Sequence, residues 1–585
     1  MLRHLPASGA CFCFALLGLV GTSARAADFR VTPAAVTLEG NFARAQLLVA
    51  AGDAPADRAA DLTRQAQYAV SDPHVLSVSP AGQLLAAGNG TAEVRVTVGG
   101  ITHAVPVTVK GVLPKPHVSF REQVLPIISK AGCNAGACHA SQFGKGGFKL
   151  SVFGYAPDED YHAIARDGMG RRIDTFDPSR SLVLRKPTLA QPHEGGHRLQ
   201  AGSVDYQVFR AWIAEGAPPS PAKTATVTGL RVLPPRRVGT PGFTQQLCVL
   251  ATYTDGSTRD VTAWAKYDST DDSVLSVSRD GLVTATGKGQ AAAMVRFEGQ
   301  AEIAQVVIPY AERVDLAGWK DNNFIDRLAA AKFREIGIEP SGLCDDATFL
   351  RRAYLDATGT LPTPEQAVAF LDSKDPAKRA KLIDELLGLT GDPARDIHNN
   401  DYAAFWALKW EDLIRSNSDA LGAEGMWALD NWLRDSFRDN KRFDRFVREL
   451  ITARGSTFSN GPANYYRIAQ GPQALTEATG QIFLGVRLTC ARCHNHPFER
   501  LSQADYYGFA AFFARVGTKT SQEFGVFGNE TVIVVREDGE VGHPRTGQIM
   551  KPTPLFGKPV KTGFDRRQAL ADWLVAPSNR MFARN

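Results

Sequence analysis

A repeated stretch of sequence decides the first part of the fold. Residues 75–90 have the sequence VLSVSPAGQLLAAGNG, and residues 274–289 have the sequence VLSVSRDGLVTATGKG, 199 positions further on. The same offset relates Tyr68 to Tyr267. In each copy, short runs of alternating apolar and polar residues, such as 92–98, lie between glycine-containing turns. This pattern is typical of small all-β sandwiches, so we predict two such domains, at 27–110 and 225–310.

The segment between the copies, residues 116–220, has a different character. Apolar residues spaced by three or four positions predict one helix at 120–130 and another at 204–217, with Phe209 and Trp212 on one face. Prolines after the second helix predict a linker. We therefore expect a small helical domain inserted between the two sandwiches.

Beyond the second copy, helical spacing recurs from about 320 to 518 and predicts a larger, mainly α-helical domain. A less regular region, 519–585, follows, and we expect it to contain the truncated start of a C-terminal domain. The expected fold class is therefore multidomain α+β, with two all-β sandwiches, one small helical domain and one larger helical domain.

Composition and the N-terminus limit the possible functions. The 585 residues are 44% apolar and 22% charged, with a formal net charge of +5. This charge is too small to favour nucleic acid as a partner. Residues 1–26 have the features of a secretory signal peptide, with Arg3, an uncharged apolar run and a small-residue cleavage site before Ala27. The run is shorter than the roughly 20 residues that a membrane span needs. We expect an exported protein without a transmembrane segment, in the periplasm or at the cell surface.

The strongest chemical motif is Cys490-Ala-Arg-Cys493-His494, which has the spacing of a c-type haem attachment site. Thiols three positions apart can reach the two vinyl groups of one porphyrin edge, and the next residue can ligate the iron. Two alternatives remain: a disulfide between Cys490 and Cys493, or a zinc site formed by Cys490, Cys493 and His496. The adjacency of His494 to Cys493 counts against a local zinc site.

A second motif, Cys133-Asn-Ala-Gly-Ala-Cys138-His139, carries the same chemistry with a longer loop between the thiols. We expect Gly136 to permit the bulge that the two additional residues require. A disulfide between Cys133 and Cys138 is the alternative here. Together, the motifs predict up to two haem groups, with His139 and His494 as metal ligands.

A second axial ligand would come from another His or Met. For the first motif the sequence offers His193, His197 and Met169, and we favour His193 because neighbouring glycines would let its loop fold over a haem edge. For the second motif it offers His496, Met426 and His543. His496 is too close to His494 to reach the opposite haem face, and we expect it to orient the site or to bind substrate.

Other conspicuous residues predict structure rather than chemistry. Trp406 and Trp410 lie one helical turn apart, which is typical of core residues. Ser502, followed three positions later by Asp505, predicts a helix N-cap. We identify no catalytic residue from the sequence.

Nearly the whole chain after the leader resembles known families. The two sandwiches resemble bacterial Ig-like group 2 domains. The stretch KAGCNAGACH at 130–139, with PHEGG at 192–196, resembles the planctomycete-type cytochrome c domain, and 320–518 resembles its companion domain of unknown function through RAYLD at 352–356 and CARCHNHPF at 490–498. The resemblance implies little about activity, because the family is named for its cytochrome-like motif and its companion domains have no assigned activity.

Three functions follow from these observations. We rank first an exported haem protein that transfers electrons to a redox partner protein. The second is a surface protein that binds polysaccharide or protein through its Ig-like domains, with disulfides or metal clips at the Cys/His motifs and no haem. The third is an oxidoreductase with haem at His494 that acts on an extracellular substrate.

Overall fold

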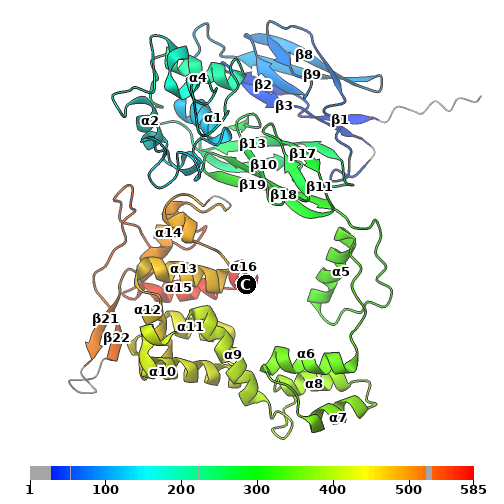
Figure 1. Ribbon diagram of the computed structural model, residues 1–585, viewed down its shortest axis with the longest axis vertical. Helices are drawn as coiled ribbons and strands as arrows, with labels where there is room; N and C mark the ends of the chain where they lie inside the picture. Colours follow the sequence, from blue (N-terminus) through cyan, green and yellow to red (C-terminus); the bar gives the residue numbers. More distant parts are fainter. Residues whose placement is uncertain (1–27, 53, 222, 497–498, 522–529, 585) are drawn as a thin grey trace, which may run out of the picture. The chain divides into compact units, whose positions relative to one another are not determined.

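The structure is a computed structural model that describes residues 28–52, 54–221, 223–496, 499–521 and 530–584. The expected signal peptide lies outside these residues. The chain divides into two compact units, Met1–Lys115 with Thr244–Cys248 and Pro116–Phe243 with Val249–Asn585. Helices and several β-sheets are both present, so the fold is multidomain α+β, as predicted (Figure 1).

The described part of the first unit consists of β-strands. One sheet has the order β2-β9-β8-β5, another the order β3-β7-β6, and β1 pairs with β4. Alternate residues are buried from Ala92 to Val96 on β8 and from Val105 to Val109 on β9, and they share one core. This is the two-residue period of a half-buried strand. The strands are β1 (Phe29–Thr32), β2 (Val36–Glu39), β3 (Arg44–Gln46), β4 (Leu48–Ala51), β5 (Gln67–Val70), β6 (Leu76–Val78), β7 (Gln83–Ala86), β8 (Gly90–Val98) and β9 (Ile101–Lys110).

The second copy of the repeat has the same local contacts as the first. The Tyr68 hydroxyl donates to the carbonyl oxygen of Thr63 over 2.7 Å, and the Tyr267 hydroxyl donates to that of Thr262 over 2.8 Å. The sheet order β11-β19-β18-β15 also matches β2-β9-β8-β5 of the first copy. The strands here are β10 (Val227–Leu233), β11 (Arg236–Val238), β12 (Thr244–Gln246), β13 (Cys248–Tyr253), β14 (Thr258–Asp260), β15 (Lys266–Ser269), β16 (Leu275–Val277), β17 (Leu282–Ala285), β18 (Gly289–Phe297) and β19 (Gln300–Ile308).

A glycine lies against the tyrosine ring in each copy. Gly82 and Gly281 have φ angles of +73° and +77°, in the left-handed region that favours glycine. A Cβ atom would come within 2.8 Å of Tyr68 at the first position and within 2.9 Å of Tyr267 at the second. Both the backbone conformation and the close approach therefore require glycine, and the sequence repeat is a structural repeat.

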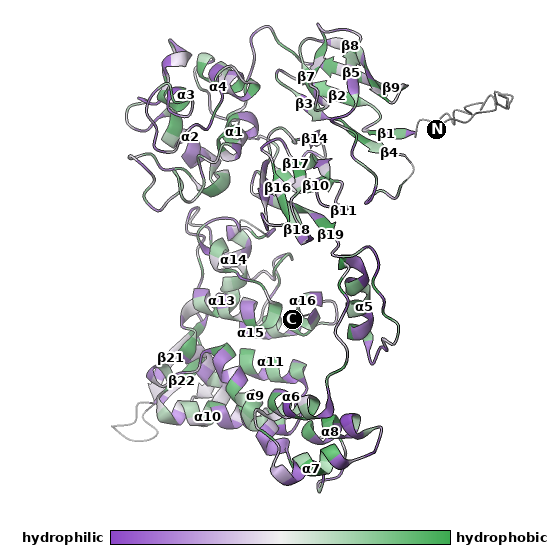
Figure 2. Cartoon of the chain, turned by 45° about the vertical axis from the view of Figure 1, so that its right-hand side comes forward, coloured by the Kyte–Doolittle hydropathy of each residue, from purple (hydrophilic) through white to green (hydrophobic). Residues whose placement is uncertain are grey.

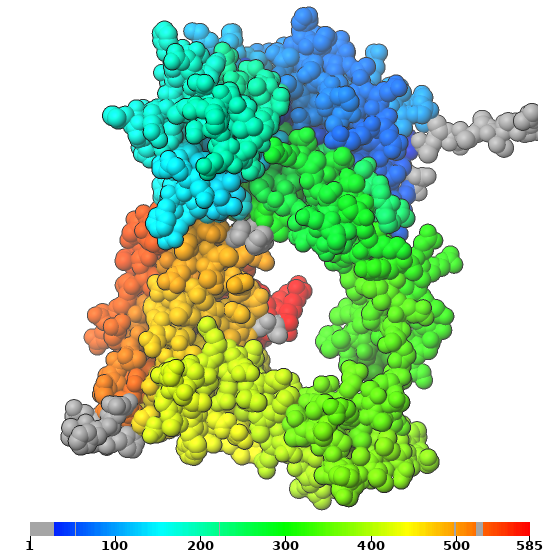
Figure 3. Space-filling model, in the orientation of Figure 1, coloured from blue at the N-terminus to red at the C-terminus, as the bar shows by residue number. Residues whose placement is uncertain are grey.

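Residues 116–220 contain short helices joined by long loops (cyan and turquoise in Figure 3). The expected helix at 120–130 begins as a π-helical turn, Phe120–Val124, and continues as α1 (Leu125–Lys130). The expected second helix is α4 (Val204–Ala214), and its Phe209 and Trp212 are both buried, as predicted. The other α-helices of this segment are α2 (Pro157–Ala165) and α3 (Leu182–Arg185).

Residues 324–518 are mainly helical, and their helices carry both hydrophilic and hydrophobic residues (Figure 2). The predicted N-cap is confirmed, because Ser502 and Asp505 form a reciprocal capping box at α14. No helix within the described ranges is long and apolar enough to cross a membrane. The elements from Phe324 onward are α5 (Phe324–Ile336), α6 (Asp346–Thr358), α7 (Pro364–Asp372), α8 (Lys378–Leu386), α9 (Asn399–Ile414), α10 (Ser418–Arg438), α11 (Phe443–Ile451), β20 (Gly455–Ser456), α12 (Tyr465–Ile468), α13 (Gly471–Leu484), α14 (Gln503–Ala510), β21 (Val516–Ser521), β22 (Glu530–Val535), α15 (Arg566–Leu574) and α16 (Arg580–Arg584).

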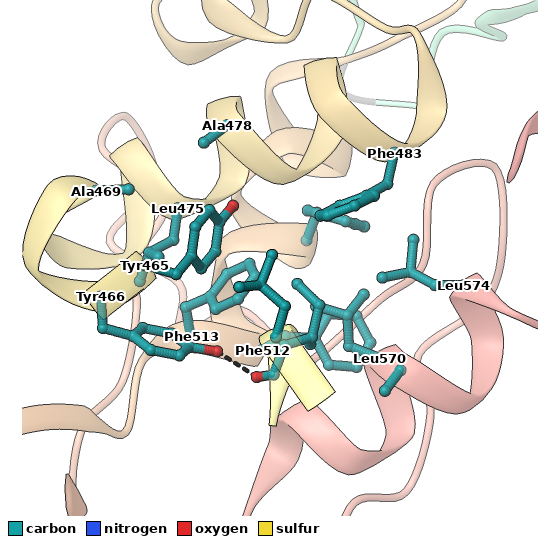
Figure 4. Close-up of a cluster of buried hydrophobic side chains, with 14 of the residues drawn as sticks. Tyr465, Tyr466, Ala469, Leu475, Ala478, Phe483, Phe512, Phe513, Leu570 and Leu574 are labelled. Carbon is teal, nitrogen blue, oxygen red and sulfur yellow. Dashed lines mark hydrogen bonds between the residues drawn. The ribbon is translucent and has the colours of Figure 1, made fainter. Parts of the chain in front are cut away.

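The core of this helical region is aromatic. Phe512 and Phe513, which follow α14, pack in one cluster with Phe483 of α13 and with Leu570 and Leu574 of α15 (Figure 4). Two tyrosines, Tyr465 and Tyr466, are buried in the same cluster, and the Tyr466 hydroxyl donates to the Ile451 carbonyl. The hydrogen bond offsets the cost of burying this hydroxyl. Trp410 packs against the cluster, whereas Trp406, one turn earlier on α9, lines a separate cavity.

Candidate functional site

The first Cys/His motif follows α1 as a tightly turned loop. The Cys133 amide donates to Ile128 O over 3.0 Å, and the His139 amide donates to Cys133 O over 3.0 Å, which closes the loop on itself. The glycine in the left-handed region here is Gly132, with a φ of +77°. Gly136 does not have a positive φ, and a Cβ there would contact nothing within 4 Å. The left-handed backbone conformation that favours glycine is therefore at Gly132 rather than at Gly136.

The structure brings His139 and His193 together. Their ring centroids are 6.2 Å apart and their planes differ by 11°. Nδ1 of His139 is 3.0 Å from Phe148 O, and Nδ1 of His193 is 3.0 Å from Gly196 O. Because a carbonyl oxygen can only accept, each Nδ1 must carry the proton, and each Nε2 therefore has a lone pair available for a metal. Hydrogen bonds of this kind fix the tautomer of metal-binding histidines.

A cavity of about 810 Å³ surrounds this pair of imidazoles. Its lining also includes both cysteines of the motif, Cys133 and Cys138. The residues that the sequence assigned to the first site therefore all line one cavity, together with His193. The volume lies within the range of small-molecule and cofactor sites. The apolar part of the lining includes Ile127, Ile128, Phe148, Leu150, Leu199 and Phe209.

Five cationic side chains and one acidic side chain, Glu194, also line this cavity. Within the described parts of the chain, neither Lys145 nor Arg171 nor Lys186 forms an ion pair. The other two cations are Arg172 and Arg198. The cavity therefore favours a ligand with a large apolar body and acidic groups.

Arg172 fixes the loop that holds the imidazole. Its guanidinium donates to the carbonyl oxygens of Gly147, Ala163 and Asp167 over 2.9 to 3.1 Å and lies 4.7 Å from the ring centroid of Phe148. Phe148 is the residue whose carbonyl accepts from the histidine. Sequence reasoning missed Arg172, because no local pattern links an arginine to backbone carbonyls 5 to 25 positions away.

Burial shifts the pKa values of two groups in the first motif. It lowers the pKa of His139, which keeps this imidazole neutral and able to ligate a metal. It raises the pKa of the Cys133 thiol to about 11, although nearby Arg198 acts in the opposite direction. The thiol therefore stays protonated near neutral pH and is a poor nucleophile for disulfide exchange.

The second motif has a different environment. Cys490 lies in a 3-10 turn, Thr489–Arg492, and Cys493 is exposed. Nδ1 of His494 is 2.7 Å from the carbonyl oxygen of Asn495, which again leaves Nε2 with its lone pair. The ring of Tyr155, 6.3 Å away between centroids, is an aromatic neighbour of His494.

The remaining candidate ligands are dispersed. His496 is buried, and burial lowers the pKa of its imidazole. Its role in the site stays a prediction. Met169 is fully exposed, and His197 is also exposed. Met426 packs against the helical core. Nδ1 of His543 accepts from the Arg545 and Thr546 amides, and its ring lies 5.9 Å from Tyr507.

The cysteines of the two motifs are relevant to the disulfide and zinc alternatives. Cys133, Cys138, Cys490 and Cys493 are free thiols in this structure. Among the described residues, no group of three His, Cys, Asp or Glu side chains is arranged to hold a metal ion in common. A disulfide in either motif and a zinc site at Cys490, Cys493 and His496 stay predictions.

Comparison with known proteins identifies one part of the chain. Residues 324–518 match the PSCyt2 family model, described as a protein of unknown function (DUF1549). No curated protein matches the chain. The solved structures that resemble it include domains 5–6 of the S-layer protein SbsC, at 10% identity and a TM-score of 0.20, over 48% of this chain and 97% of that one.

A second match, the S-layer protein rSbsC(31-844), has 12% identity and a TM-score of 0.13, and it covers 46% of this chain and 24% of that one. TM-scores of this size carry no argument about fold or function. The similarity to the PSCyt2 family concerns residues 324–518, which are about a third of the chain.

Proposed function

We propose that the protein is an exported c-type haem protein that transfers electrons at the cell envelope, with one haem in the 810 Å³ cavity of residues 116–220. The observation that carries this proposal is the pair of near-parallel imidazoles, His139 and His193, each with Nδ1 bound to a carbonyl oxygen. His139 and His193 would hold the haem iron through their Nε2 atoms, because both Nδ1 atoms are engaged by carbonyl oxygens and the rings lie 6.2 Å apart between centroids.

The rest of the cavity fits the same group. Cys133 and Cys138 would form the two thioether links, and the cationic side chains would pair with the two propionates. The apolar lining would exclude water from the porphyrin faces. When bound, the haem iron supplies a one-electron redox couple. His193 would hold the group together with His139, which favours electron transfer over chemistry on a bound substrate.

A second haem at Cys490, Cys493 and His494 completes the proposal. Here the motif has the shorter spacing, and Nε2 of His494 is available. The neighbouring ring is that of Tyr155 rather than a second imidazole. This observation favours the alternative that the second haem is an oxidoreductase centre that keeps one axial position for a substrate.

We further propose that residues 27–110 and 225–310 are Ig-like group 2 domains that space the haem-binding segments and contact surface polysaccharide or protein. The signal-peptide features of residues 1–26 support a location in the periplasm or at the cell surface. The redox partner would be a separate protein. If the motifs carry no haem, the protein is instead a surface-binding protein built on these β domains.

A haem stain tests the proposal directly. The full chain would be produced in a host with haem-attachment machinery, separated on a denaturing gel, stained for haem peroxidase activity and quantified as its pyridine haemochrome. The Cys133→Ala/Cys138→Ala and Cys490→Ala/Cys493→Ala variants would each lose one haem, and the combined variant would lose both. If no haem remains with the denatured wild-type chain, the haem proposal fails.

A further inference from the structure

A second cavity, of about 450 Å³, lies among helices α6, α8 and α9, within the PSCyt2 region. It shares no lining residue with the cavity around His139. Helix α6 presents one continuous face to it, because Phe349, Ala353 and Ala357 are spaced by one turn. Neither Cys/His motif contributes to this lining, so the cavity has no role in the function proposed above.

Aromatic rings form a fixed wall of this cavity. The indole Nε1 of Trp406 donates to Ala357 O over 3.2 Å, which ties helix α9 to helix α6. The Tyr402 ring lies one turn earlier on α9, 6.0 Å from the Trp406 ring between centroids. Opposite them, α8 contributes aliphatic side chains, and Ile383 among these is 42% exposed. A preformed apolar recess of this kind is typical of ligand sites rather than of a closed core.

Two opposite charges line the cavity without a partner among the described residues. Arg352 and Asp356 lie four positions apart on α6, yet in the described structure neither side chain forms a hydrogen bond or an ion pair. Another acid of the same helix, Asp346, is by contrast paired with both Lys378 and Arg379. The cavity thus combines an apolar, aromatic interior with one unpaired cation and one unpaired anion.

We infer that this cavity binds a small zwitterion that carries an apolar ring, the chemistry of an aromatic α-amino acid. The ring would pack against Trp406 and Tyr402. The carboxylate would pair with the guanidinium of Arg352, which suits planar two-oxygen groups. The ammonium would pair with Asp356. A simple anion would leave Asp356 without an opposite charge, and a neutral ring would leave both Asp356 and Arg352 without one.

Calorimetric titration of the full chain with four related compounds tests this inference. The compounds are L-phenylalanine, 3-phenylpropionate without the ammonium, 2-phenylethylamine without the carboxylate, and L-alanine without the ring. L-phenylalanine should bind, and each of the others should bind at least about tenfold more weakly, because each loses one charged or apolar contact.

Matched variants assign the contacts. Arg352→Gln should weaken the binding of L-phenylalanine by about tenfold and leave the binding of 2-phenylethylamine unchanged. Asp356→Asn should also weaken the binding of L-phenylalanine by about tenfold, but it should leave the binding of 3-phenylpropionate unchanged. Arg351→Gln, at the exposed neighbour outside the cavity, should change nothing. All three positions are exposed, so the variants should fold. The inference fails if L-phenylalanine shows no saturable binding at millimolar concentration. It also fails if the wild type and both cavity variants bind L-phenylalanine equally. Both outcomes can be read whether or not the chain carries haem.

Discussion

Replacing Arg172 with Met should loosen the loop that contains Phe148, the residue whose carbonyl oxygen accepts from His139 Nδ1. The Arg172 side chain is 8% exposed, and its three hydrogen bonds go to main-chain oxygens of Gly147, Ala163 and Asp167. The bond to Ala163 is buried, and the other two are partly buried. Loss of a bond to a charged donor costs about 1.5–3 kcal/mol when buried and less when solvent can replace it. We expect a total local loss of about 3 kcal/mol.

Hydrogen exchange measured by mass spectrometry can detect this loss without any cofactor. A local stability loss of about 3 kcal/mol should accelerate exchange roughly a hundredfold in peptides that cover 145–150, where the Leu150 amide donates to His139 O over 2.8 Å. The control is Arg171→Met, at an exposed neighbour. Equal exchange in wild type and Arg172→Met, or the same acceleration in both variants, would refute the positioning role of Arg172.

Three further changes test the same segment. If His139 and His193 hold a haem as proposed, His193→Ala should allow that haem to bind carbon monoxide, and an unchanged carbon monoxide difference spectrum would contradict the role of His193. Gly195→Ala should have a similar but smaller effect, because its Cβ would come within 2.6 Å of the His193 ring, whereas Gly136→Ala, with nothing within 4 Å, should leave the visible spectrum unchanged. Burial raises the pKa of Asp160 from 3.8 to about 6, so the stability that Asp160 contributes is complete below pH 4 and is lost as the pH rises through 6. Asp160→Asn should therefore stabilise the segment by up to about 3 kcal/mol at pH 8 and by little at pH 4. The urea midpoints of wild type and variant at the two pH values measure this difference. A difference that does not depend on pH would contradict the raised pKa of Asp160.

The spacing of apolar residues predicted most of the secondary structure, because an element that buries one face repeats its apolar residues with the period of a helix or a strand. The spacing of Phe209 and Trp212 predicted α4, and the capping pair Ser502 and Asp505 predicted the start of α14. The helix expected at 120–130 was right in position but begins with a π turn, in which the Ser119 hydroxyl accepts from the Glu122 amide. That detail depends on a single side-chain contact, which spacing does not encode.

The first site was predictable only where its residues are neighbours in sequence. Cys133, Cys138 and His139 form a local motif, and the glycines around His193 pointed to it as the distal ligand, which remains a prediction although the structure places the two rings side by side. The role of Arg172 and the cationic lining required the tertiary structure, because these side chains come from separate loops. The same is true of the cavity beside Trp406, a residue that the sequence assigned to the core.

The repeated β domain places one local arrangement twice in the same molecule. The two copies differ at many positions, yet in both a tyrosine hydroxyl donates to a threonine carbonyl and a glycine lies against that ring. The same substitution made at Gly82 and at Gly281 therefore meets the same contact twice within one polypeptide. Each copy can serve as an independent replicate of the other in a stability experiment.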